Sequence, residues 1–181
     1  LKPVFDKRFG QVTAGNSSQV SDGAAMLLLA SEQAVKEYDL PILGEIRDTQ
    51  WSALDPMYMG LGPVHAVSSL LERHDLTFDD IDTLEINEAF AVQVLACLEA
   101  FASKDYCQNV LELSKAWGAF DLTKLNPQGG AIAAGHPVGA SGARIVLHSL
   151  MNMKQKGLKR GVASICIGGG LGGAMLLKGG L

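Results

Sequence analysis

Short apolar runs, each bounded by glycine, proline or polar turn formers, predict β-strands along this chain. The predicted strands are residues 24–30, 42–47, 83–86, 161–167 and 174–178. Apolar residues at helical spacing, with suitable capping residues, predict helices between these strands. The predicted helices are residues 31–38, a helix that begins at Pro63, residues 89–102, and a helix that ends near Lys156.

Local signals support the ends of these helices. Ser31 is placed to cap the first helix, Pro63 suits a first helical turn, and Gly157 suits the position just after a helix. Residues 1–23 are predicted to form a loop, and residues 103–126 an irregular, polar insertion. Strands that alternate with helices predict an α/β sandwich with helices on both faces of the sheet.

Composition narrows the class of protein. The chain has 181 residues, of which 48% are hydrophobic and 19% charged, and a net charge of -4. These values indicate a soluble globular protein of one domain, or one domain and part of another, without a basic footprint for nucleic acid. The longest apolar run is residues 24–30, far short of the roughly 20 needed for a membrane span.

The three cysteines are Cys97, Cys107 and Cys166. They show no CxxC spacing, and an odd number suits a reducing compartment, so we expect a cytoplasmic protein. No pattern of histidine and cysteine with metal-ligand spacing occurs, so we expect no metal.

Three segments carry candidate chemistry, and each has a structural alternative. Asn87 and Glu88 follow a predicted strand, where open α/β sheets bind ligands, although they could simply cap a helix. His136 lies between Gly135 and Pro137 before a helix, where it could bind an oxyanion or serve as a turn residue.

Cys166 ends a predicted strand and opens a glycine run. It could be an inert buried residue or an acid/base thiol beside backbone donors, which would lower its pKa. Gly168, Gly170 and Gly173 match a dinucleotide-binding spacing, but a strand follows them rather than a helix, which excludes that motif.

In their order along the chain, these segments resemble the active-site signatures of the thiolase family. The matching stretches are Asn87-Glu88-Ala89-Phe90, Gly135-His136-Pro137-Val138-Gly139-Ala140-Ser141-Gly142 and Cys166-Ile167-Gly168-Gly169-Gly170-Leu171-Gly172. Residues 12–25 and 59–63 resemble two further elements of the family, so the resemblance covers nearly the whole chain. It implies a thiolase-like α/β fold, with a mixed five-stranded sheet and helices on both faces.

The resemblance also implies an activity, the transfer of acyl groups between coenzyme A thioesters. His136 would activate a nucleophilic cysteine, Cys166 would move the proton on the α-carbon, and Asn87 and Gly168 would form oxyanion holes. Ser18, Met59 and Phe90 would contact coenzyme A or the acyl group. Coenzyme A thioesters would be substrates, with no covalently bound cofactor. The segment 103–126 resembles longer thiolases of β-oxidation.

One member of the family's active site has no counterpart here. In the family the nucleophilic cysteine lies in the N-terminal half, and neither Cys97 nor Cys107 has suitable surroundings. The resemblance assigns residues 1–43 to the end of the loop and N-terminal domains, and residues 44–181 to the C-terminal domain. We therefore expect a C-terminal part of a thiolase, inactive alone, whose partners are coenzyme A, acyl-CoA and the N-terminal half. A complete enzyme would form a homodimer or homotetramer.

Three rival interpretations remain open at this stage. Ketoacyl synthases share the fold but would carry histidine at Asn87 and would not need Cys166. The chain could also be a non-catalytic module that binds coenzyme A or dimerises, or one subunit of a split thiolase. Because the N-terminal half that would cover them is missing, residues 19–43 are expected to expose an apolar face and to favour association.

Overall fold

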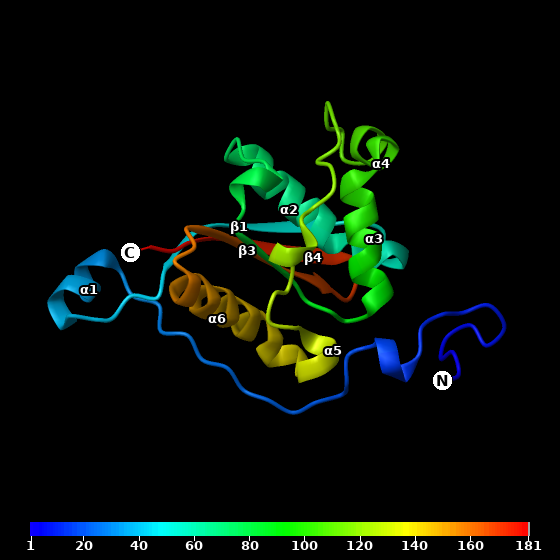
Figure 1. Ribbon diagram of the computed structural model, residues 1–181, viewed down its shortest axis with the longest axis horizontal. Helices are drawn as coiled ribbons and strands as arrows, with labels where there is room; N and C mark the ends of the chain where they lie inside the picture. Colours follow the sequence, from blue (N-terminus) through cyan, green and yellow to red (C-terminus); the bar gives the residue numbers. More distant parts are fainter. Residues whose placement is uncertain (181) are drawn as a thin grey trace.

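The computed structural model describes residues 1–180, and a mixed four-stranded sheet forms its centre (Figure 1). In spatial order the strands are β1 (Glu45–Ala53), β4 (Leu171–Lys178), β3 (Arg160–Ile167) and β2 (Thr83–Ile86). β4 runs antiparallel to both of its neighbours, whereas β2 and β3 are parallel. The carboxyl ends of β2 and β3 therefore meet at one edge of the sheet, where open α/β sheets bind ligands.

Helices cover both faces of the sheet, as predicted (Figure 1). One face carries α2 (Gly62–Arg73) and α3 (Ala91–Ala102), and the other carries α5 (Ala131–Ala134) and α6 (Val138–Lys156). Ser31 caps α1 (Glu32–Tyr38) by accepting a hydrogen bond from Ala34 N, and Gly157 ends α6 with φ of 66°. The remaining elements are η1 (Ala14–Asn16), η2 (Pro56–Leu61), η3 (Phe78–Asp80), α4 (Lys104–Asn109) and η4 (Leu122–Lys124).

The predicted fifth strand is absent, so the prediction of a five-stranded sheet is wrong. Residues 24–30 form no strand and instead run outside α6 toward α1 (Figure 1). A strand needs a neighbour for its backbone hydrogen bonds, and none lies beside this segment among residues 1–180. Within residues 1–180 no strand pairs with the free edge of β2, which is met by Leu125 in an isolated parallel bridge with Leu84 and by Asn126, whose N–H donates to Leu84 O at 2.9 Å.

Three other segments differ from their predictions. β4 begins at Leu171, three residues before the strand predicted for residues 174–178. β1 extends through Ala53, beyond the strand predicted for residues 42–47.

The segment 103–126 is not wholly irregular, because it contains α4 and η4 and contributes buried Cys107 and Phe120 to the interior. The apolar residues of this segment show no helical spacing in the sequence. Cys107 and Phe120 are nevertheless buried and hold the segment against the core.

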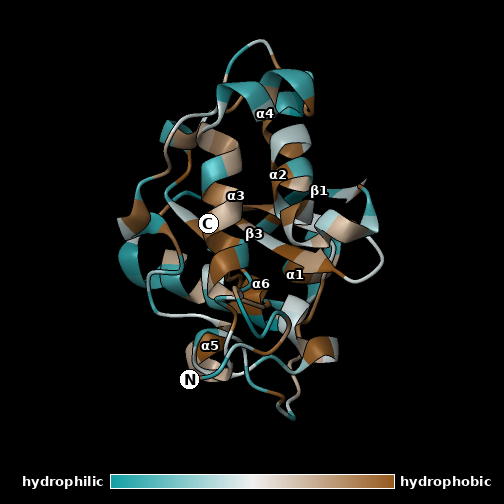
Figure 2. Cartoon of the chain, turned by 90° about the vertical axis from the view of Figure 1, so that its right-hand side faces the viewer, coloured by the Kyte–Doolittle hydropathy of each residue, from teal (hydrophilic) through white to brown (hydrophobic). Residues whose placement is uncertain are grey.

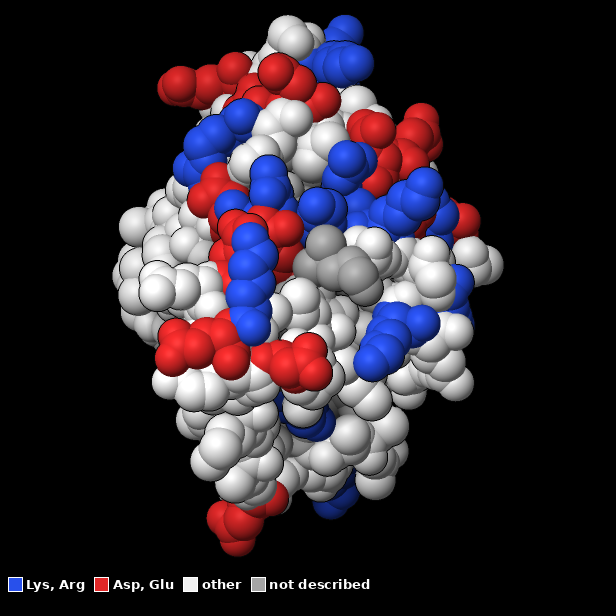
Figure 3. All heavy atoms as spheres, turned by 90° about the vertical axis from the view of Figure 1, so that its left-hand side faces the viewer, with Lys and Arg blue, Asp and Glu red and all other residues white. Residues whose placement is uncertain are grey.

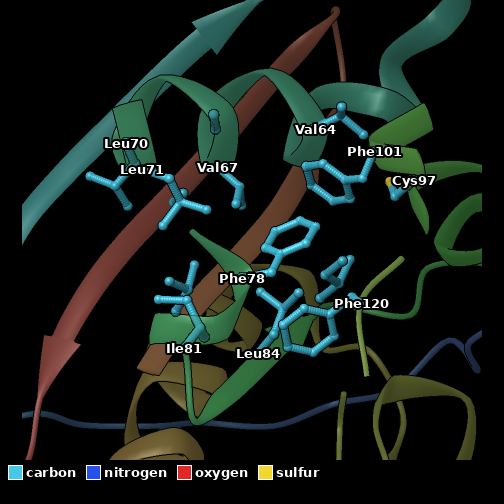
Figure 4. Close-up of a cluster of buried hydrophobic side chains, with 14 of the residues drawn as sticks. Val64, Val67, Leu70, Leu71, Phe78, Ile81, Leu84, Cys97, Phe101 and Phe120 are labelled. Atoms are coloured by element: carbon cyan, nitrogen blue, oxygen red, sulfur yellow. The ribbon is translucent and has the colours of Figure 1, made fainter. Parts of the chain in front are cut away.

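The larger hydrophobic core lies between the sheet and the helices α2 and α3 (Figure 4). The predicted apolar face of α2 is confirmed, because all four residues predicted to form it are buried: Val64, Val67, Leu70 and Leu71. Phe78 meets the rings of Phe101 and Phe120 edge-on, each with a centroid distance of 5.1 Å. Each such side chain contributes about 1.5–3 kcal/mol on burial, so this core fixes the sheet that positions the site.

The helices differ in polarity (Figure 2), and charged side chains of both signs are mixed on one face of the molecule (Figure 3). Figure 2 shows that α4 is mostly hydrophilic, whereas α3 is largely hydrophobic. On the face shown in Figure 3, acidic and basic side chains are interspersed. Ion pairs between side chains include Lys178–Glu45, with 3.6 Å between Nζ and Oε2. Within residues 1–180, no helix is long and apolar enough to cross a membrane.

Candidate active site at the carboxyl ends of β2 and β3

Asn87 and Cys166 leave neighbouring parallel strands at the same edge of the sheet. Ile86, the last residue of β2, pairs with Ser164 of β3, and Asn87 N donates to Ser164 O at 2.9 Å. Cys166 follows two residues later on β3. The register of the two strands therefore places both predicted site residues at the position where this fold class binds ligands.

The structure brings Asn87 and His136 together, although 49 residues separate them in the sequence. Asn87 is 2% exposed, and its Nδ2 lies 3.3 Å from His136 Nε2. The amide oxygen, Oδ1, is buried and has no hydrogen-bond partner within residues 1–180. A buried oxygen of this kind normally has a partner, so Oδ1 is available to bind water or a substrate group.

The backbone before His136 requires glycine. Gly135 has φ of 88°, a conformation that residues with a side chain rarely adopt, and a Cβ there would collide with the Ser21 side chain. His136 N donates to Gln19 O at 3.2 Å and to Ser21 Oγ at 3.3 Å. The N-terminal segment thus holds the histidine backbone against the site.

Ser141 orients the imidazole of His136. Ser141 is fully buried in the first turn of α6, and its Oγ lies 2.6 Å from His136 Nδ1. The Ser141 hydroxyl donates to Pro137 O at 3.1 Å, so its oxygen accepts from Nδ1–H. With Asn87 Nδ2 donating to Nε2, this network selects the neutral tautomer in which Nε2 carries the lone pair.

The electrostatic setting of His136 also favours the neutral form. Burial lowers the pKa of His136, and the positive charge of Arg144 lowers this pKa further. A neutral imidazole whose Nε2 faces the site can accept a proton near pH 7, as a general base must.

Cys166 is buried, with an exposed fraction of 7%, and alternation along β3 places it on the same face as Val162, which packs in the core with α2 and α3. Burial raises the pKa of Cys166, contrary to the expectation that nearby donors would lower it, because desolvation outweighs the backbone hydrogen bond. No hydrogen bond joins its thiol to His136 or Asn87 within the described part of the chain. Cys166 is therefore a protonated thiol near neutral pH and can act as an acid.

Gly168 opens the turn between β3 and β4. Gly169 and Gly170, which follow it, have φ of 87° and 81°. Around Gly168 no atom lies within 4 Å of the position that a Cβ would occupy, and the residue is exposed. The backbone here is open to the close approach of a ligand.

The three predicted binding residues lie around the start of α3. Ser18 N donates to Ala89 O at 3.0 Å, and Ser17 forms an isolated antiparallel bridge with Phe90. Phe90 is the half-buried residue just before α3, and Met59 lies in η2, which packs against α3. Ser18 and Phe90 are therefore brought together from distant parts of the sequence.

The other cysteines have no setting for nucleophilic chemistry. Cys97 is fully buried, and burial raises its pKa to about 12. Its thiol donates to Gly60 O at 3.2 Å. Cys107 is fully buried in α4, and its thiol lies 3.4 Å from Phe101 O. Both act as small core residues.

Sequence reasoning missed Ser141 and Asn126 as parts of this site and left Glu88 open between a ligand-binding position and a helix cap. Ser141 lies five residues after His136, which was the available signal, whereas the contacts of Glu88 and Asn126 span 38 residues or more. Among residues 1–180, no three His, Cys, Asp or Glu side chains cluster in a way that could hold a metal ion.

Comparisons with known proteins identify the family to which the chain is similar. The thiolase C-terminal domain family matches residues 40–179, and the thiolase N-terminal domain family matches residues 1–33. A 3-ketoacyl-CoA thiolase of Yersinia pestis (strain Pestoides F) is 42% identical over 179 residues, which are 98% of this chain and 41% of that protein.

Solved structures give the same result. The acetyl-CoA acetyltransferase of Bacillus anthracis is 41% identical, with a TM-score of 0.83, over 99% of this chain and 41% of that one. The dimeric peroxisomal thiolase of Saccharomyces cerevisiae is 42% identical, with a TM-score of 0.83, over 99% and 41%. The chain spans about two fifths of the length of these relatives. On the family match, the sequence identity and the shared fold, the chain belongs to the thiolase family.

Proposed function

We propose that this chain supplies the acid/base and oxyanion-stabilising part of a thiolase active site, which transfers acyl groups between coenzyme A thioesters. The observation that carries the proposal is the contact between Asn87 Nδ2 and His136 Nε2 beside the end of the Cys166 strand. This set also argues against a ketoacyl synthase, which would carry histidine in place of Asn87.

Thiolysis of a 3-ketoacyl-CoA assigns a task to each of these groups. A nucleophilic thiolate from the rest of the enzyme attacks the 3-keto carbon, and the bond between the second and third carbons breaks. The electron pair moves to the second carbon, which the Cys166 thiol protonates to release acetyl-CoA. The raised pKa of Cys166 suits this acid role, because the thiol keeps its proton until the carbanion forms.

The second half of the cycle returns the acyl group to coenzyme A. The coenzyme A thiol attacks the acyl-enzyme, and His136 Nε2 accepts the proton of the attacking thiol. The neutral tautomer selected by Ser141 leaves Nε2 unprotonated, so Nε2 can take that proton in exchange for its 3.3 Å hydrogen bond from Asn87 Nδ2. The nucleophilic cysteine leaves as a thiolate, and the proton on His136 passes through solvent to the Cys166 thiolate, which restores both groups for the next cycle. Negative charge on the thioester oxygens is stabilised by a water held at Asn87 Oδ1 and by the Gly168 N–H.

Ser18, Phe90 and Met59 are proposed to contact the pantetheine arm and the acyl group. The pairing of residues 17 and 18 with residues 89 and 90 supports this assignment, because it forms a single wall beside Asn87. We assign residues 1–43 to the end of the loop and N-terminal domains, and residues 44–181 to the C-terminal domain. The three free cysteines suit a reducing compartment such as the cytoplasm.

The rest of the enzyme is proposed to cover the segment around residues 20–29. Val20, Met26, Leu28 and Leu29 are all highly exposed here, and an apolar surface of this kind marks a contact with another protein part. That part carries the nucleophilic cysteine, whether it belongs to the same polypeptide or to a second one. The complete enzyme is proposed to be a homo-oligomer, since the yeast relative is dimeric.

A fused chimera tests this proposal. The chimera joins the first three fifths of the Yersinia relative to this chain in place of the matching part. We expect the chimera to cleave acetoacetyl-CoA in the presence of coenzyme A, whereas this chain alone does not. His136→Ala should abolish cleavage. A correctly folded chimera that binds coenzyme A but shows no turnover would contradict the proposal and favour a non-catalytic module.

A further inference from the structure

Glu88, the residue after Asn87, uses its carboxylate to hold two distant segments. Its Oε1 accepts a hydrogen bond from Asn126 Nδ2 at 3.0 Å, and its Oε2 accepts one from Ile132 N at 3.2 Å. Both contacts are long-range, over 38 and 44 residues. A charged acceptor with two N–H donors makes a stronger contact than a neutral pair would.

The contact with Ile132 caps α5 from outside that helix. Ile132 is the second residue of α5, and the residue before the helix, Gly130, has no side chain that could cap it. The first N–H groups of a helix lack partners inside the helix and favour a negative charge nearby. α5 has only four residues and leads through Gly135 directly to His136, so a group that fixes its start also fixes the histidine.

Gly130 is packed directly on this carboxylate. A Cβ at Gly130 would lie 2.6 Å from Glu88 Oε2 and 2.7 Å from Oε1, closer than any real contact. The backbone of the segment therefore reaches the carboxylate only because residue 130 lacks a side chain.

Asn126 ties the carboxylate to the sheet. Asn126 Oδ1 accepts from Ile86 N at 2.9 Å, and its Nδ2 donates to Ile86 O at 2.9 Å as well as to Glu88. The Asn126 side chain thus hydrogen-bonds the edge of β2 as a neighbouring strand would, one residue before Asn87. The Asn126 side chain therefore connects Glu88 to β2 and holds the carboxylate in position.

We propose that Glu88 is a positioning residue for His136, and that it sets the imidazole against Asn87 by holding the start of the segment 130–136. Asn87 contacts the end of this segment at His136, and Glu88 contacts its start at Ile132. Two adjacent residues on one turn thereby fix both ends of the segment that carries the proposed base.

The proposal rests on the proposed function for its catalytic meaning, but its geometry can be tested without turnover. Glu88→Gln keeps the size of the side chain but leaves only one acceptor oxygen, so its amide N–H must face a donor, Asn126 Nδ2–H or Ile132 N–H. Gly130→Ala displaces the same contact from the other side. Glu99→Gln is the matched control, because Glu99 is exposed and its side chain makes no hydrogen bond or ion pair within residues 1–180.

The test uses nitrogen-15 NMR of the four histidines in the chain, with His136 assigned from a His136→Gln variant. In the parent chain we expect the Nδ1–H tautomer of His136, with a protected Nδ1 proton. Glu88→Gln should speed exchange of that proton at least tenfold and leave the signals of His65 and His74 unchanged. Gly130→Ala should do the same, the double variant should be no worse than either single one, and Glu99→Gln should match the parent.

Kinetics of the chimera provide the second readout. A misplaced base lowers the rate of chemistry, so Glu88→Gln should lower kcat for thiolysis roughly 10- to 100-fold and leave KM for coenzyme A nearly unchanged. A folded Glu88→Gln chain whose His136 signals equal those of the parent would overturn the proposal. Unfolding of both Glu88→Gln and Gly130→Ala would also overturn it, because Glu88 would then serve global stability. A response of His136 in a chimera without turnover would instead refute the proposed function alone.

Discussion

Replacing Ser141 with alanine should damage both the stability of the chain and the orientation of His136. Ser141 is fully buried, accepts from His136 Nδ1–H at 2.6 Å and donates to Pro137 O at 3.1 Å. Pro137 O keeps two other donors in the variant, Ala140 N and Ser141 N. The only group left without a partner is therefore the imidazole N–H.

The expected loss of stability follows from the one hydrogen-bond donor that is left without a partner. A buried donor without a partner costs about 1–3 kcal/mol. His136 is only half-buried, so water can reach the ring in part, and a loss of about 1–1.5 kcal/mol in the free energy of unfolding is expected. The imidazole should also lose its preference for the Nδ1–H tautomer, which lowers thiolysis by the chimera.

Ser149 is a matched control on the same helix. Ser149 is also fully buried, but its hydroxyl has no hydrogen-bond partner within residues 1–180. Ser149→Ala therefore removes the same atom without breaking a contact and should be neutral or slightly stabilising. Urea unfolding of both variants, with unchanged m-values, measures the difference. Equal stabilities for the two variants, or an unchanged His136 tautomer in Ser141→Ala, would refute the reasoning.

Three further predictions follow from other parts of the chain. Alkylation of the folded chain at pH 7 should leave Cys97 unmodified, because a pKa of about 12 lowers its thiolate fraction about 1000-fold relative to a free thiol. Cys166 should react only slowly. Mass spectrometry measures both, and rapid labelling of either cysteine would contradict this prediction. Burial and the charge of Glu88 raise the pKa of Glu85 to about 8, although the charge of Arg144 opposes the shift. The nearest basic group, His148, lies 3.6 Å away, and its own pKa is lowered. The folded chain therefore keeps the Glu85 proton longer than the unfolded chain does, and the free energy of unfolding should fall as pH rises from 4.5 to 8. Glu85→Gln should abolish this fall, and chemical unfolding at several pH values measures it. Gly172→Ala should destabilise the chain by about 1–3 kcal/mol, because its Cβ would meet the Gly62 backbone. Gly142→Ala, in open space on a helix, should stabilise the chain by about 0.5–1 kcal/mol, and thermal unfolding distinguishes the two variants.

Local signals in the sequence identified most of the helices and strands. Ser31, Pro63 and Gly157 lie at the helix ends that their chemistry predicts, because capping depends on neighbouring residues alone. Residues 24–30 failed as a strand for the opposite reason. An apolar run has the same pattern with or without a partner strand, and pairing depends on what lies beside it in space.

In the site, too, the sequence indicated individual residues but not the contacts between them. Asn87 and His136 could be proposed from their motifs, but their contact across 49 residues depends on the packing of α6 against β2 and β3. The contacts of Glu88 with Asn126 and Ile132 are likewise set by the tertiary fold. The direction of the pKa shift at Cys166 could not be predicted, since burial outweighs the local donors that the glycine run suggested.

Separation of the two half-reactions in the chimera tests the proposed division of roles most directly. Exchange of the acetyl group between acetyl-CoA and labelled coenzyme A needs His136 but no proton transfer at carbon, whereas cleavage of acetoacetyl-CoA needs both His136 and Cys166. We predict that Cys166→Ser loses cleavage and keeps exchange, and that His136→Ala loses both. Loss of both reactions in Cys166→Ser, or exchange that survives in His136→Ala, would contradict the account.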